Sequence, residues 1–349
     1  MKKMLAIVLA LMLVFSATAA FAADYEIVSK GFQHQYWQAV LAGAQAKAAE
    51  LGVEINFVGP ANESAYDEQL SQLNSAINAA PKAIGLAALS TETCLDAIAD
   101  AQSKGIPIIG FDSGVPGAPE GAILANCATN NYNAGALAGE MVYAAIKDRI
   151  AAAEGTVRIG VSAQDAVSES VTQRGLGFID KIGELAAAEG YGVKLEGNEK
   201  YVNDAKVESA DDGKIVIETL VPSQVTAELS AIDCQNLLNK SDIIALYGSN
   251  QHSAEAMVTA NENLQKLGTG EGQVIGAGFD SGAVIKDAVR NGVFLGAITQ
   301  APFAMGEALV DTMVKAANGE AVADIDTGCQ WYTAENMNDE DIRVNLYFS

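Results

Sequence analysis

Two aspartates occur in the same short sequence at widely separated points of the chain. The segment IPIIGFDSG contains Asp112, and VIGAGFDSG contains Asp280. In both, an apolar run typical of a buried strand leads into Gly-Phe-Asp-Ser-Gly. Ligands of open α/β sheets bind beyond the carboxyl ends of the strands, where carboxylates can accept hydrogen bonds from hydroxyl groups. The repeat therefore predicts two related units, and if these face each other, both carboxylates reach one cleft.

Signals of other chemistry are missing from the sequence. The only histidines are His34 and His252, and no GxSxG motif occurs, so a Ser-His-Asp arrangement is not indicated. Neither GxGxxG nor GxxxxGK[ST] occurs either. The acidic stretch 208–213 ends like a calcium loop, but Ala210 and Thr219 stand where ligands are needed. We therefore expect no catalytic residue, no metal and no organic cofactor, and the protein is not expected to be an enzyme.

The elements that would position the aspartates alternate between short apolar runs and amphipathic stretches. The apolar runs are nearly continuous, which is typical of parallel strands covered by helices on both faces. Expected strands are 25–29, 53–58, 82–89, 106–111 and 122–127, then 157–162, 192–195, 242–247, 273–277 and 293–299. Expected helices are 36–51, 66–79, 91–104, 133–153, 171–188, 226–239, 254–267 and 283–291. This alternation predicts an open parallel sheet built twice, with 203–222 as a hairpin or extended loop on the second unit.

Composition and the first residues indicate an exported protein. Half of the 349 residues are apolar and the net charge is −23, which excludes a disordered chain and disfavours nucleic acid as a partner. Residues 1–22 combine Lys2 and Lys3, an apolar run over 4–15 and the small-x-small site Ala20-Phe21-Ala22, as in a secretory signal peptide. No cysteine follows this site, so no lipoprotein anchor is expected. Localisation is therefore predicted to be periplasmic or extracytoplasmic.

Four cysteines leave two alternatives open. They are Cys94, Cys127, Cys234 and Cys329, and no CxxC pair occurs among them. In an exported protein, four cysteines permit three sets of disulfides. Buried free thiols are the other reading.

Several segments together resemble the periplasmic sugar-binding proteins of the ribose/galactose type, the solute receptors of ABC importers. They are GFQHQYWQAVLAGAQAKAAELGV, GIPIIGFDSG, ATNNYNAGALAGE, TQRGLGF, ALYGSNQHSAEAM, VIGAGFDSG and GVFLGAITQAPFAMGEALV. The resemblance implies the type 1 periplasmic binding protein fold: two Rossmann-like α/β lobes joined by a three-strand hinge, with the ligand between them. Expected crossings are near 129–131, 300–302 and 326–329. The N-terminal lobe would comprise 24–129 plus 301–327, and the C-terminal lobe 130–300 plus 328–349.

The resemblance also implies a set of ligand-binding residues. These are His34, Tyr36 and Trp37 after the first strand, then Asp112, Ser113, Arg174, Asn250, Asp280 and Gln300. Two departures from the family pattern stand out: Ser113 replaces an arginine, and VPSQVT offers no aromatic ring from the second lobe. Gln224 in that segment is a candidate polar contact, and Ser162 and Gln164 are further candidates. Disulfides, if formed, are expected within lobes, as 94–127 and 234–329.

The expected function is capture of a neutral sugar or polyol by hinge closure. Arg174 is the only cation among these residues, against Asp112 and Asp280, which disfavours an anionic ligand. Expected partners are ABC transporter permease subunits, with a chemoreceptor as a further candidate, and the receptor is expected to be a monomer. Alternatives within binding proteins are a receptor for a nucleoside or furanosyl signal molecule, or a chemotaxis ligand-binding protein. A transcriptional regulator would need a helix-turn-helix in place of the signal peptide, and an exported hydrolase would need a nucleophile and base.

Overall fold

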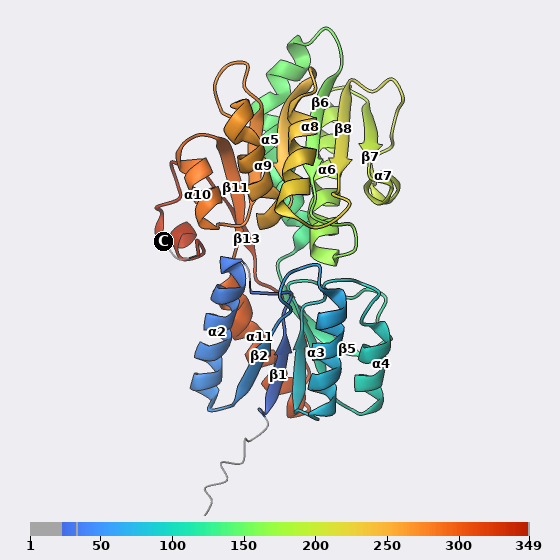
Figure 1. Cartoon of the computed structure of the whole chain (residues 1–349), viewed down its shortest axis with the longest axis vertical. Coiled ribbons are helices and arrows are strands. Elements are labelled where there is room, and N and C mark those ends of the chain that lie inside the picture. Colours follow the sequence, from blue (N-terminus) through green and yellow to red (C-terminus); the bar gives the residue numbers. More distant parts are fainter. Residues whose placement is uncertain (1–22, 33, 348–349) are drawn as a thin grey trace, which may run out of the picture.

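The protein consists of two α/β lobes stacked along its long axis (Figure 1). This computed structural model describes residues 23–32 and 34–347. The predicted signal peptide, residues 1–22, lies outside the described residues. Each lobe is built around one sheet, and the predicted architecture of two lobes with parallel sheets is confirmed.

The sheet of lobe one has six parallel strands in the order β12-β5-β4-β3-β1-β2. The strands are β1 (Tyr25–Val28), β2 (Ile55–Val58), β3 (Ala83–Leu86), β4 (Ile108–Phe111), β5 (Ile123–Ala128) and β12 (Ile325–Asp326). Its helices are α2 (Gln35–Leu51), α3 (Tyr66–Asn78), α4 (Leu95–Ser103) and α11 (Pro302–Ala317). Strands β1, β3 and β4 are buried along their whole length, as the continuous apolar runs predict.

The sheet of lobe two has seven strands in the order β13-β11-β10-β9-β6-β8-β7, of which only β13 is antiparallel. The strands are β6 (Val157–Ser162), β7 (Val193–Gly197), β8 (Ile215–Leu220), β9 (Ile243–Gly248), β10 (Ile275–Phe279), β11 (Phe294–Gln300) and β13 (Cys329–Tyr332). Its helices are α5 (Asn131–Ala152), α6 (Glu169–Ala188), α7 (Glu199–Asp204), α8 (Ala227–Leu238), α9 (Gln251–Leu264), α10 (Ala283–Arg290) and α12 (Glu340–Arg343).

The prediction of a hairpin or loop over 203–222 is wrong. Its apolar part forms β8, an interior strand that is parallel to both β6 and β7. Glu218 in this strand is 8 % exposed and pairs with Arg158 on β6 and with Lys240. This ion pairing allows a charged residue to stand in a covered strand.

The chain passes between the sheets three times: after β5, after β11, and between β12 and β13. Two of these crossings are bonded to each other. The Thr327 amide donates to the Ala128 carbonyl at 3.0 Å, and the Thr129 hydroxyl donates to the Gly328 carbonyl at 3.1 Å. The connections therefore form a narrow hinge beside the interlobe boundary.

Glycines let two helix pairs approach closely enough to position side chains at that boundary. In lobe two, a Cβ on Gly135 of α5 would collide with the Arg174 carbonyl on α6. In lobe one, a Cβ on Gly43 of α2 would collide with the Phe303 carbonyl on α11. A side chain at either glycine would push the helices apart. Gly135 therefore helps to fix the position of Arg174 relative to α5.

All four cysteines lie in the described part of the chain, and all are free thiols. The conditional pairs 94–127 and 234–329 therefore do not form. Cys94, Cys127 and Cys234 are buried, and the Cys234 thiol donates to the Ser162 hydroxyl at 3.4 Å. Burial raises the pKa of Cys234 to about 12. Cys94, Cys127 and Cys234 behave as small core residues, the second alternative left open by the sequence, whereas Cys329 is a free thiol that is only partly buried.

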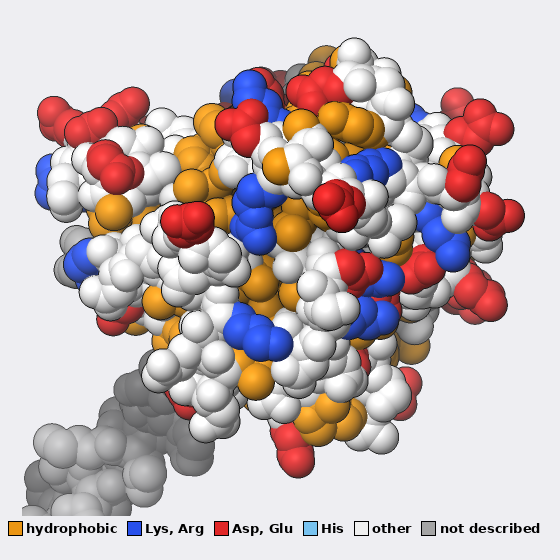
Figure 2. Space-filling view, turned by 90° about the horizontal axis from the view of Figure 1, so that it is seen from above, with side chains coloured by type: hydrophobic (Ala, Val, Ile, Leu, Met, Phe, Trp, Pro, Cys, Tyr) orange, Lys and Arg blue, Asp and Glu red, His pale blue; other side chains and the backbone are white. Residues whose placement is uncertain are grey.

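Acidic residues are spread over the end of lobe two (Figure 2). Figure 2, which looks onto the end of lobe two, shows Asp and Glu around the rim with Lys and Arg among them. Such a surface keeps a protein dispersed in water and does not mark a ligand site. Among the residues that the structure describes, no helix is long and apolar enough to cross a membrane.

Candidate ligand-binding site

A small polar cavity lies where the two lobes meet. It is lined from lobe one by Lys30, His34, Tyr36, Trp37, Glu63 and Asp112, and from lobe two by Ser170, Val171, Arg174, Asn250, Gln251, Asp280 and Gln300. Its volume is about 20 Å³, room for about one water molecule. The lobes are therefore closed on each other, and their own side chains fill the site.

The two repeated aspartates enter this site from matching turns. Asp112 follows β4 with φ 57°, and Asp280 follows β10 with φ 74°. Each amide donates to the neighbouring strand, Asp112 to the Cys127 carbonyl at 3.2 Å and Asp280 to the Ile298 carbonyl at 2.6 Å. Positive φ is uncommon outside glycine, though Asp tolerates it better than most residues. The same local conformation, used twice, places one carboxylate from each lobe in the cavity.

Asp112 faces two cations. Its carboxylate accepts from the Tyr36 hydroxyl at 2.8 Å and lies 3.6 Å from Lys30 Nζ and 3.9 Å from an Arg174 nitrogen. Lys30 Nζ also donates to the hydroxyls of Ser168 and Ser170 in lobe two, at 2.9 and 3.3 Å. Asp112 and Lys30 therefore form the polar joint between the lobes.

Arg174 is the central side chain of the site. It is 3 % exposed, donates from Nε to Asn131 at 2.8 Å and from Nη2 to Gln300 at 3.1 Å, and stacks over the Phe279 ring at 4.0 Å. Burial disfavours its charge, but Asp280 and Asp112 outweigh burial and raise its pKa. The guanidinium is thus held, charged, between the two aspartates.

Asp280 is surrounded by neutral donors of its own lobe. Its carboxylate accepts from Gln300 Nε2 at 2.7 Å, the Tyr347 hydroxyl at 2.6 Å and the Gln251 amide at 3.0 Å. These bonds fix the direction of both carboxylate oxygens. Gln251 begins α9, so a helix N-terminus also faces this carboxylate.

A chain of side chains crosses the opposite wall of the site. The Trp37 indole donates to Glu63 at 2.8 Å, Gln164 donates to Glu63 at 3.1 Å, and Asn250 donates to Gln164 at 2.9 Å. Burial alone would raise the pKa of Glu63, but electrostatic interaction with His34 and Lys30, with the two donated bonds, lowers it. Glu63 therefore links lobe one to lobe two as an ionised carboxylate.

The structure brings together most of the residues that the sequence predicted. His34, Tyr36, Trp37, Asp112, Arg174, Asn250, Asp280 and Gln300 all line the cavity. Ser113 lies behind it, where its hydroxyl accepts from the Ser170 amide at 3.2 Å. Gln224 is exposed and lines a separate groove, so the structure does not support it as a ligand contact. Of the further candidates, Gln164 reaches the site through Asn250, whereas Ser162 bonds to Cys234.

Sequence reasoning missed Lys30 and Glu63. Lys30 lies two residues beyond the end of β1, close to a strand end as the aspartates are, so the same rule could have drawn attention to it. Glu63 lies in the 59–65 loop, whose composition carries no such signal. The expectation of a single cation is therefore corrected: Lys30 is a second one.

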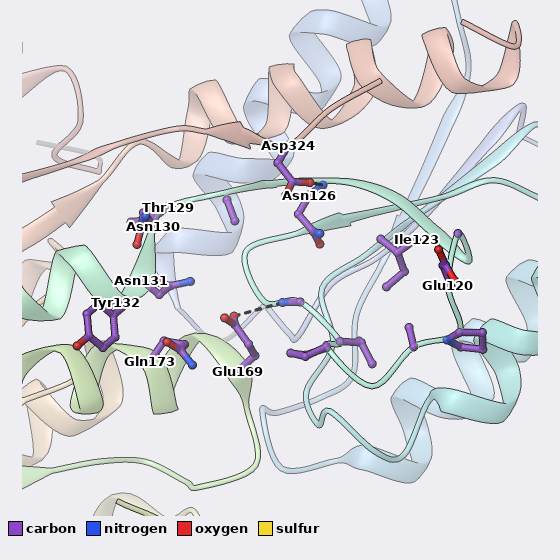
Figure 3. Close-up of a pocket in the computed structure, with 17 residues that line it drawn as sticks. Glu120, Ile123, Asn126, Thr129, Asn130, Asn131, Tyr132, Glu169, Gln173 and Asp324 are labelled. Atoms are coloured by element: carbon purple, nitrogen blue, oxygen red, sulfur yellow. Dashed lines mark hydrogen bonds between the residues drawn. The ribbon is translucent and has the colours of Figure 1, made fainter. Parts of the chain in front are cut away.

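A larger hollow lies beside the hinge (Figure 3). It measures about 510 Å³ and is lined by the 114–121 loop of lobe one, the first crossing, and Glu169 and Gln173 of α6. Glu169 accepts a 3.4 Å bond from the Gly114 amide across the lobes, the dashed line of Figure 3. Burial raises the pKa of Glu169. Within the described ranges, no cluster of three or more His, Cys, Asp or Glu side chains could hold a metal ion.

Two α/β lobes that enclose a polar cavity between carboxylates from both halves define a bilobed receptor for a small molecule. Residues 25–321 match the family described as periplasmic binding protein domain, and the chain belongs to this family. The resemblance noted in the sequence is thereby confirmed. The description of the family implies an extracytoplasmic location.

Relatives and solved structures agree with this family. The chain is 24 % identical over 332 residues to the D-allose-binding periplasmic protein of Escherichia coli K12, covering 93 % of this chain and 94 % of that protein. A structure from Brachyspira murdochii, titled ABC transporter, LacI family transcriptional regulator, is 34 % identical with TM-score 0.78, covering 94 % and 99 % of the two chains. An ABC transporter solute-binding protein from Agrobacterium vitis, with bound D-fucose, is 26 % identical with TM-score 0.76, covering 93 % and 99 %.

Proposed function

We propose that this protein is the extracytoplasmic solute receptor of an ABC importer and binds a neutral sugar or related polyol between its lobes. The observation that carries the proposal is the convergence of Asp112 and Asp280 on one enclosed cavity, with Arg174 between them. A relative that is named for D-allose binding and a solved structure that contains bound D-fucose support the ligand class.

The side chains of the cavity suit hydroxyl groups. Carboxylates accept from a hydroxyl, while Lys30, Arg174 and the Asn250 amide can donate to its oxygen. Inside the cavity, three carboxylates (Asp112, Asp280 and Glu63) face two fixed cations. An anionic ligand would add an uncompensated charge to this buried site, which is costly. A neutral polyhydroxylated ligand adds none.

Binding requires the lobes to separate and close again. A monosaccharide does not fit in a cavity with room for one water, so it enters an open form. On closure it replaces cross-lobe bonds such as Glu63 to Gln164 and Lys30 to Ser168 with bonds of its own. Since closure is favoured by contacts made to both lobes at once, the ligand shifts the population toward the closed form. Permease subunits would then recognise the closed surface.

Calorimetry and thermal shift with a panel of sugars test the proposal. At a hundredfold excess over Kd, a ligand should stabilise the protein by about 2.7 kcal/mol. The panel holds pentoses, hexoses including D-allose and D-fucose, polyols and nucleosides. Stabilisation by nucleosides alone would favour the alternative ligand class, and stabilisation by none of the panel would contradict the proposal.

Two variants tie binding to the cavity. Arg174→Lys keeps a charge but loses the planar fork of donors, and affinity should fall at least about tenfold. The matched control is Arg290→Lys on α10, whose guanidinium is exposed and pairs only with Asp287 among the ion pairs of the described residues. The control should bind like wild type.

The proposal also includes the expected lobe boundaries, oligomeric state, export and partners. The moving bodies would be 24–129 plus 301–327 and 130–300 plus 328–349, and the receptor would be a monomer exported through a signal peptide over residues 1–22. N-terminal sequencing of the secreted protein and light scattering check export and oligomeric state. A pull-down from solubilised membranes would check the permease and, separately, a chemoreceptor.

A further inference from the structure

The last described segment of the chain, residues 344–347, folds back onto the second aspartate turn. The Tyr347 amide donates to the Ser281 hydroxyl at 3.1 Å, and Lys286 Nζ donates to the Tyr347 carbonyl at 2.6 Å. The Asn345 carbonyl accepts from the Thr299 hydroxyl at 2.8 Å. These bonds attach the segment to lobe two alone.

The ring of Tyr347, however, packs against the core of lobe one. Its exposed fraction is 3 %, and it belongs to the apolar cluster formed by Tyr36, Trp37 and Met305. The rings of Tyr347 and Tyr36 meet edge to face, with centroids 5.9 Å apart and planes at 68°. A side chain that is anchored in one lobe and buried in the other loses that burial when the lobes separate.

The two tyrosines also match in their hydroxyl bonds. Tyr36 donates to Asp112 at 2.8 Å, and Tyr347 donates to Asp280 at 2.6 Å. Tyr36 lines the cavity, whereas Tyr347 does not, so it reaches a ligand only through Asp280 and Tyr36. Nothing in the sequence pattern of the two turns points to this residue, which lies 67 positions after Asp280.

We propose that Tyr347 is a positioning residue that clasps the closed form: its hydroxyl orients the Asp280 carboxylate, and its ring holds lobe two against Tyr36 of lobe one. The inference deepens the proposed function and rests on it for the role of Asp280 in ligand binding. The hydroxyl and the ring make different contacts, so substitutions can remove one contact or both.

Two substitutions separate the hydroxyl from the ring. Tyr347→Phe removes the bond to Asp280 and keeps the aromatic contact, so sugar affinity should fall about tenfold while the ligand-free protein stays as closed as wild type. Tyr347→Ala removes both, so affinity should fall further and the ligand-free protein should open. Val344→Ala is the control, because Val344 belongs to the same segment and is 67 % exposed.

Two measurements read these effects. Stopped-flow binding of the sugar found with wild type should show faster dissociation in Tyr347→Ala. Association should be at least as fast as in wild type, because more of the ligand-free variant is open. Small-angle X-ray scattering of the ligand-free proteins should show a larger radius of gyration for Tyr347→Ala than for wild type, Tyr347→Phe or Val344→Ala. Far-UV circular dichroism confirms that each variant is folded, and Tyr347→Phe keeps the test valid if the alanine variant is not.

The outcomes separate the two proposals. Wild-type affinity and dissociation rates in both Tyr347 variants, with unchanged scattering, would overturn the clasp and leave the receptor proposal standing. If wild type binds no sugar, the receptor proposal fails, and the scattering comparison still decides whether Tyr347 holds the lobes together.

Discussion

The two GFDSG turns begin alike and end in different surroundings. Asp112 and Asp280 both have a positive φ, and the backbone amide of each donates a hydrogen bond to the neighbouring strand. The carboxylate of each accepts from a tyrosine hydroxyl. After the first turn the chain continues as the 114–121 loop, whereas after the second it enters α10 directly. The first turn bonds both within lobe one and across to lobe two, whereas the second bonds mainly within its own lobe.

The two turns differ most clearly in the cations that lie near their carboxylates. Both carboxylates raise the pKa of Arg174, with Asp280 contributing more than Asp112, so Arg174 does not distinguish the turns. Lys30 does, because it lies 3.6 Å from Asp112. Two turns of the same sequence can thus place a carboxylate in the same way and still differ in role. The first takes part in contacts between the lobes, whereas the second is held within lobe two.

The largest effect is expected at Asp112. Asp112→Asn leaves the buried Lys30 without its nearest counter-charge, and the free energy of unfolding should fall by about 3 kcal/mol. Asp280→Asn keeps an acceptor for its neutral donors and should cost about 1–2 kcal/mol. Denaturant unfolding measures both.

A double-mutant cycle with Lys30→Met sharpens this comparison. Asp112 and Lys30 should couple strongly, whereas Asp280 and Lys30 should be close to additive. Equal coupling in both cycles would show that the two turns share one charge network and that the contrast between them is mistaken.

A smaller effect is expected at the serines that follow the aspartates. Ser113 accepts from the Ser170 amide of the other lobe, and Ser281 accepts from the Tyr347 amide of its own lobe. Each alanine variant should lose about 1 kcal/mol. For Ser113→Ala the loss should be seen in sugar affinity, and for Ser281→Ala in faster hydrogen exchange of the Tyr347 amide. If Ser281→Ala changed sugar affinity and Ser113→Ala changed hydrogen exchange of the Tyr347 amide, the contrast between an interlobe turn and a turn held within lobe two would be contradicted.

The smallest effect concerns pH. Glu169 meets the first turn at the Gly114 amide, and burial raises its pKa in the folded state. Its contribution to stability is fully present below the unfolded pKa of about 4.3 and is lost as pH rises through the folded value. Glu169→Gln should therefore be more stable than wild type at pH 7, and the gain should disappear toward pH 4. A gain that is independent of pH would rule out ionisation as its cause.

Much of the fold could be predicted from periodicity. Buried parallel strands read as continuous apolar runs, and every predicted strand and helix overlaps an observed one. Prediction failed at β8: a polar stretch precedes this β-rich run, which was expected in a hairpin or extended loop. The pairing of Glu218 with Arg158, which lets the run enter the sheet, is a tertiary contact. A single sequence shows a charge but not the partner that neutralises it.

The residues of the site also fall into those that the sequence could predict and those that it could not. Residues placed by a strand end, such as Asp112, Asp280 and Asn250, were found because strand ends of a parallel sheet meet at one edge. Glu63 and Tyr347 could not be found, since each arrives from a segment whose path depends on how the whole chain packs. Gln224 follows β8, whose place in the sheet the sequence did not reveal, and in this structure it lines a separate groove.

Cys329 has a practical use that follows from its position. The other three thiols are at most 3 % exposed, whereas Cys329 is partly accessible at the start of β13, directly after the third crossing. Burial raises its pKa to about 11, so alkylation should be slow at neutral pH and faster in mildly alkaline buffer. A fluorophore attached there would sit at the pivot of the natural chain, and opening could be followed optically without introducing a foreign cysteine.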